Sequence, residues 1–117
     1  MAIGGTSHGP PTAALVKMIT RIWHGKTKAE HADEYLQFVI DTGVPDYKST
    51  EGNLGVEILR RIDGSECHFW TVTKWDNYES IKQFAGDDFE KAKYYPEDEN
   101  YLLEFELNVI HCETYIF

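Results

Sequence analysis

The feature that most constrains this fold is the segment 17–25, KMITRIWHG. The alternation of a β-strand places Ile19 and Trp23 on one face and Ile22 and His24 on the other. Both faces carry large apolar side chains, so neither can be left in water. A strand buried on both sides usually lies in the centre of its sheet. We therefore predict a central strand that ends in a Trp-His-Gly corner.

A helix is predicted directly after this strand. Thr27 and Glu30 have the spacing of a capping box, in which each side chain accepts from the other residue's backbone N–H. Gly43 is the natural end of the helix, and Pro45 blocks its continuation. Residues 44–50 are then an irregular segment or a single turn. The apolar stripe of the helix consists of Ala32, Tyr35, Leu36, Val39 and Ile40.

The middle of the chain predicts a β-hairpin. Two segments of strand-forming residues, 54–62 and 66–75, are separated by Asp63-Gly64. Asp-Gly is typical of a type I′ turn, which joins two antiparallel strands.

The last third of the chain predicts a second helix and a fourth strand. Asp76 caps the helix and Gly86 ends it. We expect residues 88–93 to form a further helical turn and the last strand to cover 103–115. The order β-α-β-β-α-β with right-handed crossovers predicts a ferredoxin-like α+β sandwich with antiparallel sheet order 4-1-3-2. This domain covers 17–117, and 1–16 is a flexible N-terminal extension that includes His8.

The apolar pattern also predicts a homodimer. Two helices can cover only one face of a four-stranded sheet, yet the strands carry apolar side chains on both faces. An open face of that composition exceeds the apolar patch that a soluble monomer tolerates. Two sheets packed face to face would cover it.

Composition narrows the class of partner. The chain has 20 acidic and 11 basic residues, for a formal charge of −9. An acidic surface repels nucleic acid and anionic lipid, so neither is expected as a partner. The two cysteines, Cys67 and Cys112, lie on separate predicted strands and fit free thiols in a reducing cytoplasm. No apolar run has the length of a membrane span.

These features together resemble the antibiotic biosynthesis monooxygenase (ABM) family of the dimeric α/β-barrel superfamily, in particular a largely uncharacterised branch of it. The resemblance runs from about residue 18 to 115. It is carried by Trp23-His24-Gly25, Gly52-Asn53-Leu54-Gly55, Phe69 six residues before Trp75, Trp75-Asp-Asn-Tyr-Glu-Ser80, Phe84-Ala85-Gly86, Tyr94-Tyr95-Pro96-Glu97-Asp98 and Val109-Ile110-His111.

The resemblance implies a pocket between the sheet and the helices of each protomer. Oxygenases of the family use no metal or flavin: a deprotonated phenol or hydroquinone passes an electron to O₂ directly. Such chemistry needs a base, a dry aromatic cavity and a donor for the developing anion. Heme-degrading relatives carry Asn, Trp and an axial His where this chain has Ile22, Phe84 and Lys93, so heme degradation is not expected.

His24 is the first candidate for the catalytic base. It ends the central strand, and the family register assigns it to the face under the helices, where an imidazole suits proton abstraction near neutral pH. The alternative is a corner histidine hydrogen-bonded to backbone. His68 begins the third strand at the same end of the sheet, so a shared site is possible.

His111, on the last strand, is a second catalytic candidate, as part of a relay with His24. The alternative is a histidine of the core. No zinc-binding spacing accompanies either histidine, so no metal site is predicted.

Tyrosines and other aromatic residues complete the candidate site. Tyr94 is a catalytic candidate whose hydroxyl would bind a substrate oxygen, and Tyr95 would lie on the same rim. Trp75 and Phe84 either line the substrate pocket or fill the core, and Trp70 either contacts substrate or belongs to the dimer face.

Three hypotheses of function follow. The first is a cofactor-free monooxygenase acting on an aromatic or quinone-type metabolite. The second is a dimeric module that binds a ligand and performs no chemistry. The third is a cyclase or isomerase with a His–Tyr pair on the same fold.

Overall fold

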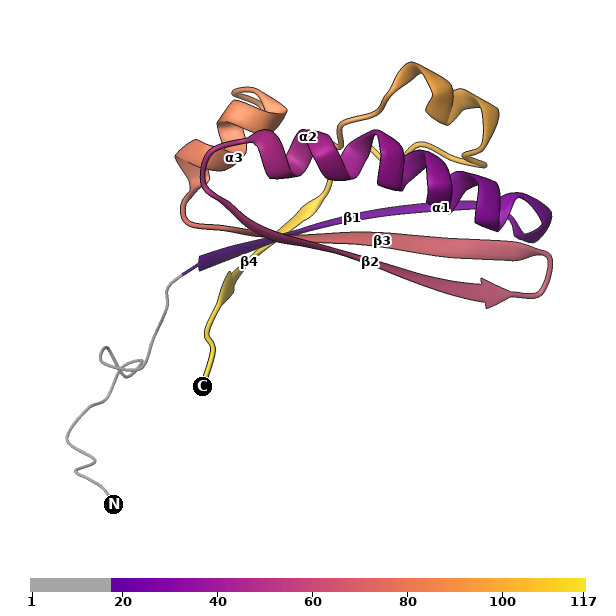
Figure 1. Ribbon diagram of the computed structural model, residues 1–117, viewed down its shortest axis with the longest axis horizontal. Coiled ribbons are helices and arrows are strands. Elements are labelled where there is room, and N and C mark those ends of the chain that lie inside the picture. The colour runs from indigo at the N-terminus through magenta and orange to yellow at the C-terminus, as the bar shows by residue number, and fades with distance from the viewer. Residues whose placement is uncertain (1–17) are drawn as a thin grey trace.

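The computed structural model describes residues 18–117, so the predicted extension 1–16, with His8, and the first residue of the predicted domain, Lys17, lie outside the described residues. The helices all lie on one side of a single sheet, whose other face they leave uncovered (Figure 1). The elements are β1 (Met18–Lys28), the 3₁₀ helix η1 (Ala29–His31), α1 (Ala32–Asp41), α2 (Gly43–Ser49), β2 (Asn53–Asp63), β3 (Glu66–Trp75), α3 (Tyr78–Ala85), the 3₁₀ helix η2 (Pro96–Asn100) and β4 (Ile110–Thr114).

The sheet has the order β2-β3-β1-β4, and every pairing is antiparallel. This confirms the ferredoxin-like fold and the predicted order 4-1-3-2. Strand β1 lies between β3 and β4, with Gly25 opposite Phe69 and Arg21 opposite His111. The central position follows from the apolar groups on both faces of β1.

The core lies between the sheet and the helices, in two clusters. One packs Trp23 and Phe69 against Tyr35 of α1, with the Tyr35 and Phe69 ring centroids 5.0 Å apart. The other packs Trp75 against Ile81 of α3, and both side chains are fully buried. Each helix therefore covers its own half of the sheet.

The opposite face of the sheet, which we call the open face, is also apolar. Trp70 and Ile22 lie half-buried on it, next to Leu59 at 48% and Ile110 at 62% exposure. No described helix or loop covers these last two side chains.

The start of the first helix differs from the predicted capping box. Strand β1 continues to Lys28 because Thr27 pairs with Cys67 of β3. Thr27 is fully buried, and its hydroxyl donates to the Lys28 carbonyl. Pairing within the sheet outweighs the local capping preference.

The first helix ends close to the predicted stop, at Asp41, but Gly43 begins a second helix instead of a non-helical segment. After a break at Thr42, whose backbone N–H and hydroxyl both reach the Phe38 carbonyl, the chain enters α2 at Gly43. Pro45 lies in the first turn of α2, where a backbone N–H has no helical partner and proline is tolerated.

The last third of the chain departs most from prediction. Asn77, not Asp76, caps α3: its side chain accepts from the backbone N–H of Ser80, and Asp76 accepts from the Ser80 hydroxyl. Residues 88–93 are not helical, and β4 begins only at Ile110. The segments 90–92 and 107–109 instead bond to each other through their backbones.

Gly52 allows a stability prediction. Its φ is +92°, and an added Cβ would lie 2.0 Å from the Ser80 hydroxyl oxygen. Gly86 has nearly the same φ, +90°, with open space around it. Gly86→Ala should destabilise by about 1–3 kcal/mol through backbone strain alone. Gly52→Ala should destabilise by about 2 kcal/mol more, because of the clash. Urea unfolding measures both; equal losses would contradict the packing around Gly52.

Candidate functional site

The strand β1 presents its side chains to two different environments. Arg21 and Trp23 point towards the helices, whereas Ile22 and His24 lie on the open face. The prediction that His24 lies under the helices is therefore wrong. Alternation defines two faces of a strand but does not say which one the helices cover.

A small cavity lies between β1, β3 and the helices. Its volume is about 20 Å³, room for about one water molecule. We call it the helix-side cavity. Its lining is aromatic with a few polar groups, and includes Trp23, Tyr35, Tyr47, Lys93, Tyr95 and Asp98.

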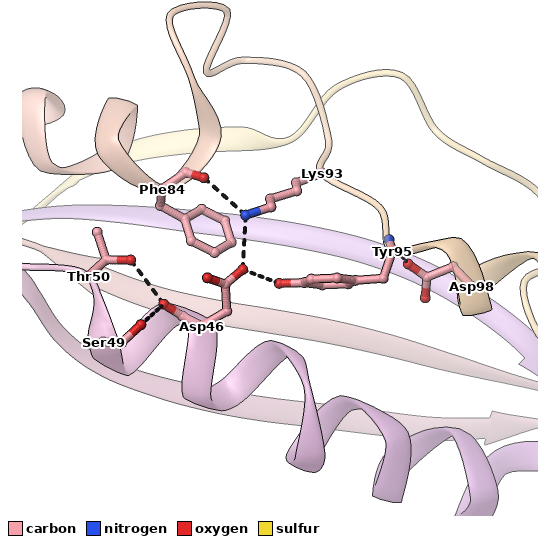
Figure 2. Close-up of polar contacts among 7 residues, drawn as sticks. All are labelled: Asp46, Ser49, Thr50, Phe84, Lys93, Tyr95 and Asp98. Carbon is pink, nitrogen blue, oxygen red and sulfur yellow. Dashed lines mark hydrogen bonds and ion pairs between the residues drawn. The ribbon is translucent and has the colours of Figure 1, made fainter.

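On one side of the cavity, Lys93 and Tyr95 converge on Asp46 of α2 (Figure 2). The Lys93 ammonium lies 2.9 Å from Asp46 Oδ2 and donates to the Phe84 carbonyl at 3.2 Å. The Tyr95 hydroxyl donates to the same carboxylate oxygen. Burial opposes ionisation of Asp46, but these two donors outweigh it and lower its pKa. The ammonium is thus fixed at the cavity wall by a charged partner.

Asp98 is the buried carboxyl group of the cavity. It is 2% exposed, and its oxygens accept from the Tyr35 hydroxyl at 2.8 Å and from the Tyr95 backbone N–H at 2.7 Å. Burial raises the pKa of Asp98, although both hydrogen bonds oppose the rise. A carboxyl group of raised pKa beside a cavity is a candidate general base.

Trp23 contributes an unused donor to the same lining. Its indole Nε1 is buried and has no partner among the described residues. An unpaired buried donor is costly, so a ligand acceptor placed here would be stabilised.

Arg21 and His111 form a second polar group on the helix side. Arg21 is 1% exposed, and its guanidinium donates to the carbonyls of Phe89 and Lys91 and to His111 Nε2, the last at 3.1 Å. Burial and the nearby Arg21 charge lower the pKa of His111 to about 4. His111 is therefore neutral at pH 7, and it carries its proton on Nδ1, which has no described partner.

The open face holds a chain of three titratable groups. His24 Nδ1 contacts the Glu106 carboxylate, and His24 Nε2 lies 2.9 Å from His68 Nδ1. The Trp70 ring lies against both imidazoles, with centroids at 5.3 and 5.7 Å. The predicted shared site of His24 and His68 is thus formed as a contact, on the face opposite the helix-side cavity.

The other predicted site residues lie in different parts of the structure. Tyr95 lines the cavity. Tyr94 instead packs on Trp23 and Phe105 and donates to the Glu106 carbonyl at 2.6 Å. Trp75 and Phe84 are core residues, and Trp70 lies on the open face. His24 and His111 point to opposite sides of the sheet, so they cannot form the predicted relay.

Sequence reasoning missed Asp46, Asp98, Glu106 and the burial of Arg21. Asp98 belongs to an acidic cluster, Glu97-Asp98-Glu99, that reads as solvated surface. The available signal was the position of Asp98 after Tyr95-Pro96. In a turn that begins with proline, the side chain of the third residue can accept a hydrogen bond from the backbone N–H of the residue before the turn. Asp98 accepts from the Tyr95 N–H in this way.

Two further properties of residues 18–117 bear on function. No three His, Cys, Asp or Glu side chains among them are placed to hold a metal ion. None of the helices formed by these residues has the length and apolar character to cross a membrane.

Comparison with known proteins supports the fold. No family model and no curated protein sequence matches the chain. The structure is similar to the crystal structure of a putative antibiotic biosynthesis monooxygenase from Bacillus cereus, with a TM-score of 0.50 and 14% sequence identity, over 86% of this chain and 93% of that chain. The ABM-like fold implied by the sequence resemblance is thereby confirmed.

The Arg21–His111 contact generates a prediction about pH. In the unfolded chain an imidazole takes up a proton near pH 6.5, about its ordinary value, whereas folded His111 resists protonation down to about pH 4. Between these values the unfolded state binds more protons, so stability falls as the pH falls. The slope is at most about 1.4 kcal/mol per pH unit, reduced by solvent because the ring is only partly buried.

His111→Gln should flatten this part of the stability profile relative to wild type. Urea unfolding between pH 4 and 7 measures the difference. His31→Gln, on η1 at the surface, is the control and should keep the wild-type slope. Identical slopes in wild type and His111→Gln would contradict a His111 that stays neutral in the folded protein down to about pH 4.

Proposed function

We propose that the protein binds a small phenolic or quinone-type metabolite in the helix-side cavity and oxygenates it with O₂, without a metal or flavin. The fold similarity to an ABM protein supports this reaction class. The observation that carries the proposal is Asp98, a buried carboxyl group of raised pKa in an aromatic cavity that also holds a fixed ammonium group.

In this proposal Asp98 replaces His24 as the base. The carboxylate takes the phenolic proton, and the electron-rich phenolate passes an electron to O₂. Lys93 then stabilises the negative charge that develops on oxygen, and its contacts with Asp46 and Phe84 hold it in place beforehand. Trp23 Nε1, which has no described partner, is available to a ligand oxygen.

The cavity must enlarge to admit an aromatic ring. Its present volume of about 20 Å³ is far below that of a typical ligand site, about 300 Å³ or more. Tyr95 forms part of its wall and is attached to α2 through Asp46. Outward movement of Tyr95 and the η2 segment that follows it would open the cavity, and the Tyr95–Asp46 hydrogen bond is the contact that must break.

Oxygen consumption tests the reaction. Purified protein with a panel of monocyclic and bicyclic hydroquinones should consume O₂ in proportion to substrate oxidised. Asp98→Asn should lower kcat about 10²-fold or more, the usual contribution of a general base. Glu97→Gln, the exposed neighbour, is the matched control and should retain activity. No substrate-dependent uptake by wild type would contradict the proposal.

The second candidate function is ligand binding without chemistry. It is favoured by the small volume of the cavity and because both Asp98 oxygens already accept hydrogen bonds. Saturable binding of the same hydroquinones with no oxygen uptake would support it. The cyclase or isomerase hypothesis expected a His24–tyrosine contact, and none is formed: His24 bonds to Glu106 and His68.

We also propose that the protein is a homodimer closed through the open face. Leu59 is exposed on it opposite Trp70, and Ile110 is exposed opposite Ile22. Exposed Phe105 and Leu107 lie in the segment that precedes β4. A soluble monomer rarely leaves an apolar surface larger than about 600 Å² uncovered. A second copy of the chain has the same uncovered apolar surface, and a two-fold contact between the two copies would bury both surfaces.

Leu59→Glu tests the dimer. The charge would be buried in the interface, so the variant should sediment as a monomer at micromolar concentration while wild type sediments as a dimer. Ile40→Glu on α1 has a similar starting exposure, 42% against 48% for Leu59, and should stay dimeric. A wild-type mass of one chain would rule out the interface.

A further inference from the structure

The guanidinium of Arg21 is a buried positive charge without a counter-ion. No Asp or Glu oxygen among residues 18–117 forms an ion pair with it, although six other ion pairs of Lys or Arg are present there. Residues 1–17 contain no Asp or Glu, so that part of the sequence has no side-chain carboxylate to offer. None of these side chains therefore supplies a negative charge to Arg21.

The partners that Arg21 does have are all neutral. They are two backbone carbonyls, the Tyr47 hydroxyl and the imidazole of His111, whose low pKa keeps it uncharged at pH 7. Arg21 Nε has no described partner. A buried charge without a counter-ion destabilises the folded state, because it has lost its hydration and gained no opposite charge. A ligand that brings a negative charge nearby would recover part of this free energy.

Phe84 and Tyr47 connect this charge to the helix-side cavity. The Arg21 guanidinium lies 5.8 Å from the centroid of the Phe84 ring, and Tyr47 stacks on the same ring at 4.3 Å. Tyr47 lines the cavity, and its hydroxyl lies within hydrogen-bonding reach of the Arg21 guanidinium. Burial raises the pKa of Tyr47 to about 12, and the charge of Arg21 opposes that rise. Tyr47 is thus a neutral donor with a cation close to it.

After a ligand proton has moved to Asp98, Arg21 is the charged group near the cavity that lacks an oppositely charged partner among the described residues. Lys93 is paired with Asp46, and Tyr35 and Tyr95 are neutral because their pKa values are raised. If Asp98 takes the phenolic proton, its own charge disappears and the ligand oxygen becomes negative. The bond broken is the phenol O–H, the bond formed is the carboxyl O–H, and the total charge of the site is unchanged.

From this geometry we propose that the helix-side cavity binds its ligand as an oxyanion, which accepts a hydrogen bond from the Tyr47 hydroxyl and takes Arg21 as its counter-charge. Arg21 acts as a positioning residue, through Tyr47 and through its field, without touching the ligand. The inference deepens the proposed function and rests on the same cavity. It restricts the ligand to phenols, enols or other acids that ionise near neutral pH.

A chromophoric phenol, 4-nitrophenol, tests the proposal without oxygen chemistry. Its absorbance reports directly whether the bound molecule is the phenol or the phenolate. Titration with wild-type protein between pH 5 and 9 should show that phenolate binds at least tenfold more tightly than phenol, so that bound probe stays ionised at least one pH unit below free probe. His111 is neutral throughout this range because its pKa is about 4.

Three variants separate a charge effect from a structural one. Arg21→Gln should remove the preference for phenolate but leave the affinity for the non-ionisable analogue 4-nitroanisole unchanged, and Arg21→Lys should restore part of the preference. Tyr47→Phe removes the hydroxyl beside Arg21 and keeps the ring, so the variant should fold and lose a several-fold part of the preference for phenolate. Tyr47→Phe alone decides the result if Arg21→Gln does not fold.

Three outcomes would overturn the inference: no binding of millimolar probe to wild type, bound probe that ionises like free probe, or a phenolate preference that Tyr47→Phe leaves intact. Failure of the oxygenase proposal has a different result. A protein that ionises the probe but consumes no O₂ with any hydroquinone retains the anion site and loses only the reaction.

Discussion

The central position of β1, with one face buried under the helices and a half-buried apolar face on the other side, is the constraint on which the rest of the structure depends. Arg21 and Trp23 are enclosed between the sheet and the helices, while Ile22 and His24 face away from them. One strand thus separates two chemically different surroundings. The helix side holds a small aromatic cavity and, near it, a cation without a described counter-ion. The open face holds two imidazoles and a carboxylate on an apolar surface.

We assign ligand chemistry to the helix side because its polar groups are costly to bury and are incompletely satisfied. Arg21 Nε, Trp23 Nε1 and His111 Nδ1 are buried donors without described partners. A core that served stability alone would use apolar residues here, since buried polar groups are tolerated when fully bonded. On the open face, by contrast, both ring nitrogens of His24 have partners, Glu106 and His68. They lie where the proposed dimer would cover them.

The sequence was sufficient for the fold because its signals are local. Alternating apolar residues, the Asp63-Gly64 turn and the helical stripe before Gly43 set the order of elements, and handedness set the strand order. The site was less accessible. Which face of β1 the helices cover, and the burial of Asp98 behind Tyr35, depend on contacts between residues far apart in sequence. The non-helical segment 88–93 has the same cause, since its backbone bonds to 107–109.

The central claim is that ligand binds on the helix side of the sheet, and the three indole N–H groups report on it separately. Trp23 Nε1 lines the helix-side cavity unpaired, Trp75 Nε1 is bonded to Thr73 at 2.8 Å in the core, and Trp70 lies on the open face. In ¹⁵N–¹H spectra, a hydroquinone titration should shift the Trp23 indole resonance downfield and leave that of Trp70 in place. A shift of Trp70 with Trp23 unchanged would place the ligand on the open face and contradict the account.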